Sequence, residues 1–297
     1  METELIVTYV VCDDVVKNLK IKEDVQVKMT TAEVMTTAII AASQYFGNFE
    51  RARTSLENSG DIPDMLSKSQ FNRRLHQIKE DVWSAVLEAL AIEFAKYNIE
   101  NEFIVDSCPV YACKLARQNQ TKLYGERKYL GFCAAKQEYF IGLKLHLVAD
   151  VNTNPTKMML RPARESDIAS FRKFDLDMSP NSVILGDKAY NDYQHEERLI
   201  HEKQIHLMPI RKANSKRKSS GASDHERKKK RRLIETLFSC IERLMPRSIH
   251  AVTIAGLILK ATLFVLAYAF KRYAVPPTGA PFETPTTSAL RASGLGN

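Results

Sequence analysis

The 297-residue sequence predicts an all-helical N-terminal region followed by an α/β domain with a mixed sheet flanked by helices. Two observations lead to this prediction. Residues 1–98 contain capping boxes followed by apolar residues spaced three to four apart, which is the period of a helix. From residue 102 onward, short apolar or alternating segments typical of strands are interspersed with helical patterns. The length agrees with two domains of roughly 100–200 residues each.

The composition excludes several classes of protein. Hydrophobic residues make up 44% of the chain and charged residues 26%, so a fibrous or wholly disordered protein is excluded. The five cysteines form no CxxC pair and are odd in number, which argues against a disulfide framework or a zinc cluster. The acidic start lacks the basic segment of a secretory signal. We therefore expect a soluble protein of the reducing cytoplasm.

The apolar segment 251–270 is the one candidate for a membrane span in this sequence. It reaches the roughly 20 residues that a bilayer requires. However, Lys260 lies at its centre, where a charge costs about 2.5–3.5 kcal/mol on insertion scales. We therefore expect a buried helix of a large domain and no contact with a membrane.

Three helices can be placed within the N-terminal domain, residues 1–98. A capping box at Thr30 precedes an apolar run, and a second helix covers Phe49–Asn58. A further capping box at Ser67 precedes a long helical pattern that extends to Leu90.

The last two of these helices, joined by a short turn, would suit a helix-turn-helix that reads DNA. The start of the final helix carries side chains of the types that contact phosphates and bases. These side chains are Lys68, Gln70, Asn72, Arg73 and His76, with Arg74 as a further basic candidate. Any three-helix packing unit has a similar pattern, so DNA reading and a purely structural role both stay open.

Residues 99–273 form the predicted α/β domain, with five strands. The strands are Glu102–Asp106, Tyr139–Asp150, Thr156–Arg161, Ser182–Gly186 and Gln204–Ile210. The first three follow one another in hairpin succession, and helices lie between the third and fourth, between the fourth and fifth, and after the fifth. Antiparallel strands followed by right-handed crossovers give a mixed five-stranded sheet. This order of elements is ribonuclease-H-like.

Three acidic residues stand where this topology would bring them together. Asp106 ends the first strand, Asp187 directly follows the fourth, and Glu235 lies on the helix after the fifth. Ligands gather near strand ends in open sheets. Carboxylates suit Mg²⁺, and two ions roughly 4 Å apart can activate an attacking oxygen and stabilise a leaving one. Each acid taken alone is more often a surface carboxylate, and Glu242 shares the helix stripe of Glu235.

The excess positive charge lies in one basic insertion, residues 211–232. It contains eleven Lys and Arg against two acids, a net charge of +9, whereas the whole chain has +8. Such a run indicates either an anionic partner or a solvated surface. The DNA contacts that we expect in and near this domain are Lys188, Arg211, Lys212, Lys228, Arg231 and Arg232.

Four motifs in this order resemble those of bacterial insertion-sequence transposases of the DDE superfamily. They are IVDSCPV around Asp106, GFCAAKQEYFIGLKLHL at 131–147, ILGDKAYND around Asp187 and RRLIETLFSCIERL around Glu235. IHAVTIAGLILK at 249–260 also matches, so the resemblance covers roughly residues 102–270. It implies a ribonuclease-H-like catalytic domain in which Asp106, Asp187 and Glu235 hold Mg²⁺ or Mn²⁺, with two ions.

The resemblance implies an enzyme that cleaves phosphodiester bonds at the ends of its insertion element and transfers the freed 3′-hydroxyls to target DNA. It also implies that two copies of the chain form a homodimer in the DNA complex. The expected location is the bacterial cytoplasm, in association with the nucleoid, and no small-molecule cofactor is expected. Two alternatives stay open, a structure-selective nuclease on the same fold and a non-catalytic DNA-binding regulator. The acidic triad favours the two enzymes, and joined DNA products distinguish the transposase from the nuclease.

Two positions depart from the pattern of the relatives. Many relatives have a basic residue seven positions after the glutamate, where this chain has Glu242, and a His-Asp pair in the segment written here as Glu165-Ser166-Asp167. Neither departure changes the three carboxylates. Residues 274–297 have no periodic apolar pattern, so we expect a disordered tail.

Overall fold

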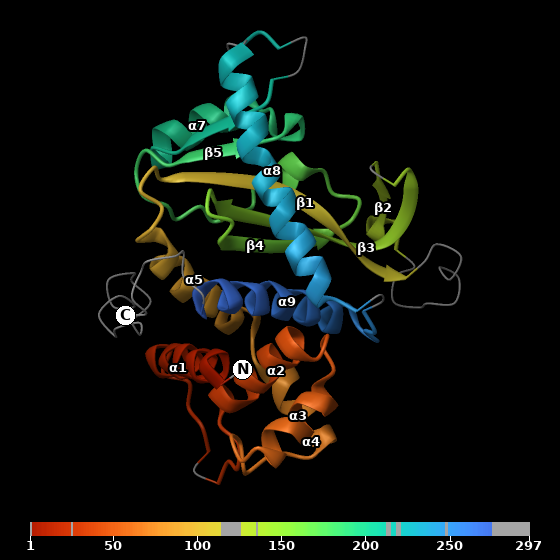
Figure 1. The fold of residues 1–297 in the computed structure, drawn as a ribbon. Coiled ribbons are helices and arrows are strands. Elements are labelled where there is room, and N and C mark those ends of the chain that lie inside the picture. The colour runs from red at the N-terminus through yellow and green to blue at the C-terminus, as the bar shows by residue number, and fades with distance from the viewer. Residues whose placement is uncertain are drawn as a thin grey trace. The chain divides into compact units, whose positions relative to one another are not determined.

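The structure is a computed structural model that describes residues 2–24, 26–113, 126–134, 136–211, 215–217, 221–246 and 249–274. The predicted DNA contact Lys212 and the predicted tail, apart from Ala274, therefore lie outside the described residues. The chain forms two compact units (Figure 1). Unit 1 contains the chain up to Phe94, residues 241–247 and the chain from Ala255; unit 2 contains residues 95–240 and 248–254.

The described part of unit 1 is helical. Its helices are α1 (Glu2–Asn18), α2 (Thr31–Gln44), α3 (Phe49–Asn58), α4 (Lys68–Gln77), α5 (Glu80–Ala95) and α9 (Ile254–Ala274). The capping box that opens α2 is present: the Thr30 hydroxyl accepts the Glu33 N–H at 3.2 Å, and the Glu33 carboxylate accepts the Thr30 N–H at 2.6 Å. Helix α3 has the predicted bounds.

The single long helix predicted to extend to Leu90 is wrong. Helix α4 ends at Gln77, Ile78 has extended backbone, and α5 begins at Glu80. The apolar spacing runs on across this break because both helices bury their apolar residues, among them Phe71 and Val86. A continuous apolar pattern therefore did not require one continuous helix.

Helix α9 belongs to unit 1, whereas the predicted domain boundaries placed it with the α/β domain. Its Tyr273 ring lies 6.3 Å from the Phe94 ring of α5, and its Lys260 ammonium lies 5.7 Å from the centre of the Phe49 ring. It is the one helix in the described residues that is long and apolar enough to cross a membrane, but 72% of that stretch is buried inside the protein. We therefore read α9 as a core helix, as the sequence predicted.

Unit 2 contains the sheet. Its strands are β1 (Glu102–Cys113), β2 (Leu130–Cys133), β3 (Glu138–Asp150), β4 (Pro155–Pro162), β5 (Val183–Gly186) and β6 (His206–Pro209). Its helical elements are η2 (Arg127–Tyr129), α6 (Asp167–Phe171), η3 (Lys188–Tyr190), α7 (Tyr193–Lys203) and most of α8 (Gly221–Leu244).

The sheet has six strands in the order β2-β3-β1-β5-β6, with β4 paired to β3. Strands β1 to β4 pair antiparallel, while β5 runs parallel to β1 and to β6. The predicted mixed sheet with ribonuclease-H-like order is confirmed, but the predicted number of five strands is wrong. The missed strand β2 has only four residues and forms by pairing with the start of β3.

The two faces of the sheet are covered by different helices. Phe103 and Val105 of β1 pack in one core cluster with Phe171 of α6 and Leu199 of α7. Helix α8 crosses the other face (Figure 1), and its Lys230 forms ion pairs with Glu100 and Glu102. Alternate residues of β1 therefore point to different helices.

Replacement of Gly142 by alanine tests the close contact between β3 and β1. A Cβ at Gly142 would lie 2.1 Å from the backbone oxygen of Val110, so one of the two strands would have to move. We expect Gly142→Ala to lower the free energy of unfolding by about 3 kcal/mol, the upper end of the usual cost of overpacking. Urea unfolding followed by circular dichroism measures this loss. Tyr139→Ala on the same strand, at a side chain that is 59% exposed, should cost only about 1 kcal/mol, and an equal loss in both variants would contradict the prediction.

Candidate active site

The candidate site lies where β1 and β5 separate. Their parallel pairing ends at Ile104 and Leu185. Asp106 and Asp187 each lie two residues beyond this last pair, and the backbone of Asp187 is still extended. Because side chains alternate along extended backbone, both carboxylates point to the face of Ile104 and Leu185, which is the face that α8 crosses.

One detail of the prediction needs correction: Asp106 does not end the first strand. Strand β1 continues to Cys113 because it stays paired with β3, where Asp106 lies opposite Leu147. Only the pairing with β5 ends before Asp106. The carboxylate is thus held on a central strand with one neighbouring strand beside it and an open position on the other side.

The Asp106 carboxylate is mostly buried, with 18% of its side chain exposed. Burial raises its pKa to about 6, against the opposing effects of the Ser107 N–H and the Arg231 guanidinium, and the nearby Asp187 carboxylate raises it further. The Ser107 N–H donates to the carboxylate at 2.8 Å. A negative charge on Asp106 is therefore costly unless a cation lies beside it.

Asp187 is oriented by the turn that follows β5. Its carboxylate caps η3 and accepts the N–H of Ala189 at 2.7 Å. Tyr190, the next residue along, is fully buried. Burial raises the pKa of the Tyr190 hydroxyl, and the Asp106 and Asp187 carboxylates raise it further, so both acids lie within electrostatic reach of the same ring.

Glu235 lies on α8 and, within the described residues, is linked to Asp106 through Arg231. The guanidinium of Arg231 donates to Glu235 at 3.0 Å, while its Nε lies 3.6 Å from Oδ2 of Asp106. Within the described residues, no group of three or more His, Cys, Asp or Glu side chains is close enough to hold a metal ion. The structure thus brings the two aspartates together and places an arginine between them and the glutamate.

Two of the predicted DNA contacts in unit 2 are engaged in ion pairs. Arg231 is shared between Asp106 and Glu235, and Arg211 binds both carboxylate oxygens of Glu196 at 2.7 Å. Arg211 is only 15% exposed and Glu196 only 4%. The number of positive charges in the sequence could not reveal these ion pairs. The partners Glu196 and Asp106 lie outside the basic insertion, and Glu235 lies just beyond its end.

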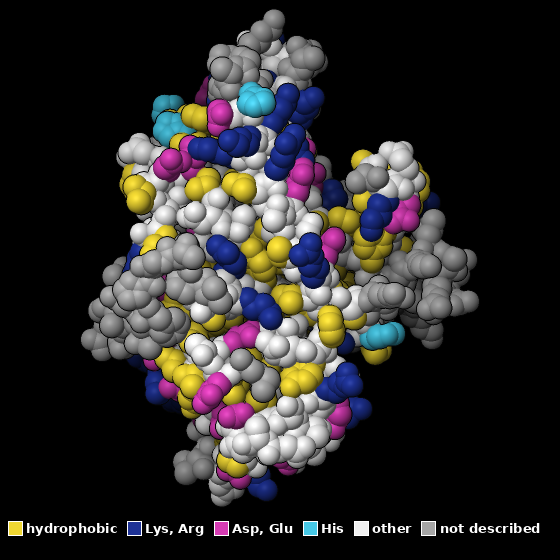
Figure 2. Space-filling view, in the orientation of Figure 1, with side chains coloured by type: hydrophobic (Ala, Val, Ile, Leu, Met, Phe, Trp, Pro, Cys, Tyr) yellow, Lys and Arg dark blue, Asp and Glu magenta, His cyan; other side chains and the backbone are white. Residues whose placement is uncertain are grey.

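Most of the other basic candidates that the structure describes are exposed to solvent. Lys188, Lys228 and Arg232 are exposed, and within the described residues none of them forms an ion pair. Figure 2 shows Lys and Arg side chains gathered over the part of α8 that contains the last two. In α4, Lys68 and Arg73 are exposed, whereas Arg74 lies 3.8 Å from Glu23.

A second polar group, which the sequence did not identify as a site, lies behind Asp106. The Asp167 carboxylate of α6 accepts the Ser107 hydroxyl at 2.8 Å and the Lys144 ammonium at 3.1 Å. His146, opposite Ser107 in the sheet, is fully buried, and burial lowers its pKa to about 4. Strand alternation was the available signal, because Ser107 must point away from the face of Asp106.

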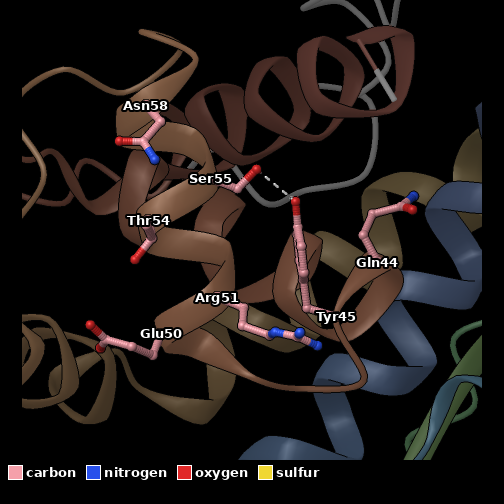
Figure 3. A pocket seen from close by; sticks show the side chains of 7 residues that line it. All are labelled: Gln44, Tyr45, Glu50, Arg51, Thr54, Ser55 and Asn58. Atoms are coloured by element: carbon pink, nitrogen blue, oxygen red, sulfur yellow. Dashed lines mark hydrogen bonds between the residues drawn. The ribbon is translucent and has the colours of Figure 1, made fainter.

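Unit 1 contains a polar pocket of about 610 Å³ between the end of α2 and α3 (Figure 3). The Tyr45 hydroxyl and the Ser55 hydroxyl point toward each other there and form a hydrogen bond of 2.8 Å. The pocket is lined by Gln44, Tyr45, Glu50, Arg51, Thr54, Ser55 and Asn58. None of the predicted site residues lines it.

The mixed six-stranded sheet flanked by helices is consistent with the ribonuclease-H-like class. The model of one protein family, described as the transposase DDE domain, matches residues 98–270, which is more than half of the chain. The chain therefore belongs to the DDE transposase family, whose members use divalent metal ions and act on DNA. Comparison with curated proteins and with solved structures gave no match.

The buried carboxylate of Asp106 gives a testable dependence of stability on pH. Its pKa in the folded protein, about 6, lies above the unfolded value of 3.8, so the folded state binds the proton more tightly. The free energy of unfolding without metal should therefore lose this contribution as the pH rises from about 4 to about 6. We expect metal-free Asp106→Asn to be about 1–3 kcal/mol more stable than the wild type at pH 8 and equally stable at pH 4.

Thermal unfolding of both proteins in a metal chelator at the two pH values measures this difference. Glu242→Gln, which removes a carboxylate at an exposed position of α8, serves as the control and should leave the difference between the two pH values unchanged. An Asp106→Asn variant that is no more stable than the wild type at pH 8 would contradict the prediction.

Proposed function

We propose that the chain cleaves phosphodiester bonds at the ends of an insertion element and joins the freed 3′-hydroxyls to target DNA. The observation that carries this proposal is the pair of aspartates, Asp106 and Asp187, on one face of the sheet in a chain of the DDE family. In this reaction water first breaks a phosphodiester bond and leaves a 3′-hydroxyl. That hydroxyl then attacks a target phosphodiester, and a new 3′-hydroxyl leaves.

The proposed metal ligands are Asp106, Asp187 and Glu235, holding Mg²⁺ or Mn²⁺, with two ions as the family resemblance implies. The residues fit this role by their chemistry, because carboxylate oxygens are the ligands that Mg²⁺ prefers. Burial of Asp106 beside a second carboxylate also creates a demand for positive charge at this point. When bound, the ions supply activation of the attacking oxygen and stabilisation of the leaving one.

We propose Glu235, and not Glu242, as the third ligand. The two residues lie seven apart on α8, which is about 10 Å along a helix, whereas a metal pair spans about 4 Å. They cannot both bind one cluster directly. Glu235 is favoured because the side chain that it contacts, Arg231, also lies beside Asp106.

The proposed DNA contacts are of two kinds. In unit 2 the exposed Lys188, Lys228 and Arg232 would bind phosphates near the acidic site, and in unit 1 Lys68 and Arg73 of α4 would bind the transposon end. We propose that two copies of the chain assemble on the DNA, in the bacterial cytoplasm and without a small-molecule cofactor. The alternative nuclease activity would give the same cleavage without joined products.

Cleavage of DNA that contains the element's ends tests the proposal. We expect Mn²⁺-dependent nicking followed by joined products, and a loss of at least a hundredfold in Asp106→Asn and Asp187→Asn with DNA binding retained, because both lose a charge that holds the metal. Glu235→Gln should be equally inactive, whereas Glu242→Gln should retain most of the activity. An active Glu235→Gln beside an inactive Glu242→Gln would move the site along α8, and nicking without joining would favour the nuclease.

The basic side of α8 gives a prediction for DNA binding. Each phosphate that a protein neutralises contributes a slope of about −0.9 to log K against log salt. Replacing Lys228, Lys229 and Arg232 by alanine should therefore make the slope less steep by about 2–3 for duplex DNA of any sequence. Fluorescence anisotropy at several salt concentrations measures it. Replacing Arg211, which is held by Glu196, should change the slope by less than 1, and equal effects of both changes would contradict the prediction.

A further inference from the structure

A positive charge of the chain itself lies between two of the proposed metal ligands. The Arg231 side chain, which is 31% exposed, is directed at Oε1 of Glu235 and at Oδ2 of Asp106. Its Nε is enclosed and, within the described residues, donates no hydrogen bond. The interaction of the guanidinium with the buried Asp106 is therefore electrostatic, without a hydrogen bond from Nε.

We propose that Arg231 occupies the cation position of the acidic site in the metal-free protein and that a divalent metal ion must displace it. This inference rests on the proposed function, because it takes Asp106 and Glu235 to be metal ligands. The physical reason is charge: Asp106 is buried near Asp187, and two neighbouring carboxylates repel each other unless a cation lies between or beside them. A guanidinium supplies that charge when no metal is present.

Competition follows from the atoms involved. The guanidinium contacts one carboxylate oxygen of Asp106 and one of Glu235, and a metal held by both side chains would have to share or take these oxygens. A metal ion and a guanidinium placed together would also repel each other. Occupation of the site by Arg231 therefore lowers the apparent affinity for metal.

The position of Arg231 on α8 determines what its release would do. It lies one turn from Lys228 and next to Arg232, both exposed, so a freed guanidinium would join a basic surface. Metal binding would then create an additional phosphate contact, and DNA that takes up Arg231 would raise the affinity for metal by the same factor. The sequence-based prediction that Arg231 contacts DNA would thus hold for the metal-loaded protein.

The neighbouring Lys230 shows what an ordinary structural ion pair on this helix looks like. It pairs with Glu100 and Glu102, neither of which is a proposed metal ligand. Arg231 differs because both of its partners are. If Arg231 only held α8 against the sheet, its removal would leave the affinity for metal unchanged or would reduce it.

Binding of Mn²⁺ to the full-length protein without DNA tests the inference, measured by the loss of the free-ion signal in electron paramagnetic resonance. Arg231→Ala should bind Mn²⁺ on the order of fivefold more tightly than the wild type, as expected for removal of one competing ion pair. The matched control Arg232→Ala removes the same charge from the next position of α8 and should change the affinity less than twofold. Arg231→Gln, which keeps a long polar side chain, repeats the test if the alanine variant unfolds.

The second measurement is the affinity for duplex DNA with Ca²⁺, as a non-cleaving ion, and with a chelator. Arg231→Ala should weaken DNA binding in Ca²⁺ and leave it unchanged in the chelator. Equal Mn²⁺ affinity of the Arg231 and Arg232 variants, or weaker Mn²⁺ binding by both Arg231 variants, would overturn the inference while the proposed metal site stands. Equal Mn²⁺ binding by the wild type and Asp106→Asn would instead remove the proposed metal site, and the inference with it.

Discussion

The charge on one buried carboxylate is the constraint around which the acidic site is arranged. Asp106 lies on the central strand with 18% of its side chain exposed, and the Asp187 carboxylate lies close enough to raise its pKa further. Desolvation and like-charge repulsion both disfavour the ionised pair, so a cation is needed beside it. Arg231 of α8 supplies positive charge beside Asp106, and the proposed divalent metal ion would meet the same electrostatic demand.

The sheet topology explains how such a costly site is held in place. Strand β1 pairs with β3 along nearly its whole length but with β5 over only three residues, so Asp106 is fixed on one side and open on the other. Its neighbour Ser107 points to the opposite face, where its hydroxyl donates to the Asp167 carboxylate, which also accepts the Lys144 ammonium. Alternation along one strand thus separates the face that carries the Asp106 carboxylate from the face on which Ser107 is hydrogen-bonded.

The sequence predicted those features that depend on local pattern. Strand alternation, the capping box at Thr30 and the order of elements predicted the mixed sheet and most helix positions. Each of these signals depends on residues that are close together in the sequence. Two of the errors concern strand pairing, and one concerns a break between two helices. Strand β2 exists only through β3, the break at Ile78 lies within an unbroken apolar pattern, and Asp106 lies inside β1 because β3 continues beside it.

Ion pairing determines which cations of the basic insertion, residues 211–232, are exposed to solvent. Its net charge of +9 does not reveal this. Lys230 and Arg231 point back to acids of unit 2, while Lys228 and Arg232 face solvent. These assignments follow the turn of the helix. Neighbouring residues are about 100° apart around its axis, so one run of cations places some side chains against the acids of unit 2 and others in solvent. The helix that carries Glu235 therefore also carries the arginine beside Asp106 and the exposed cations that we propose as DNA contacts, and a shift of α8 along its axis would alter all three at once.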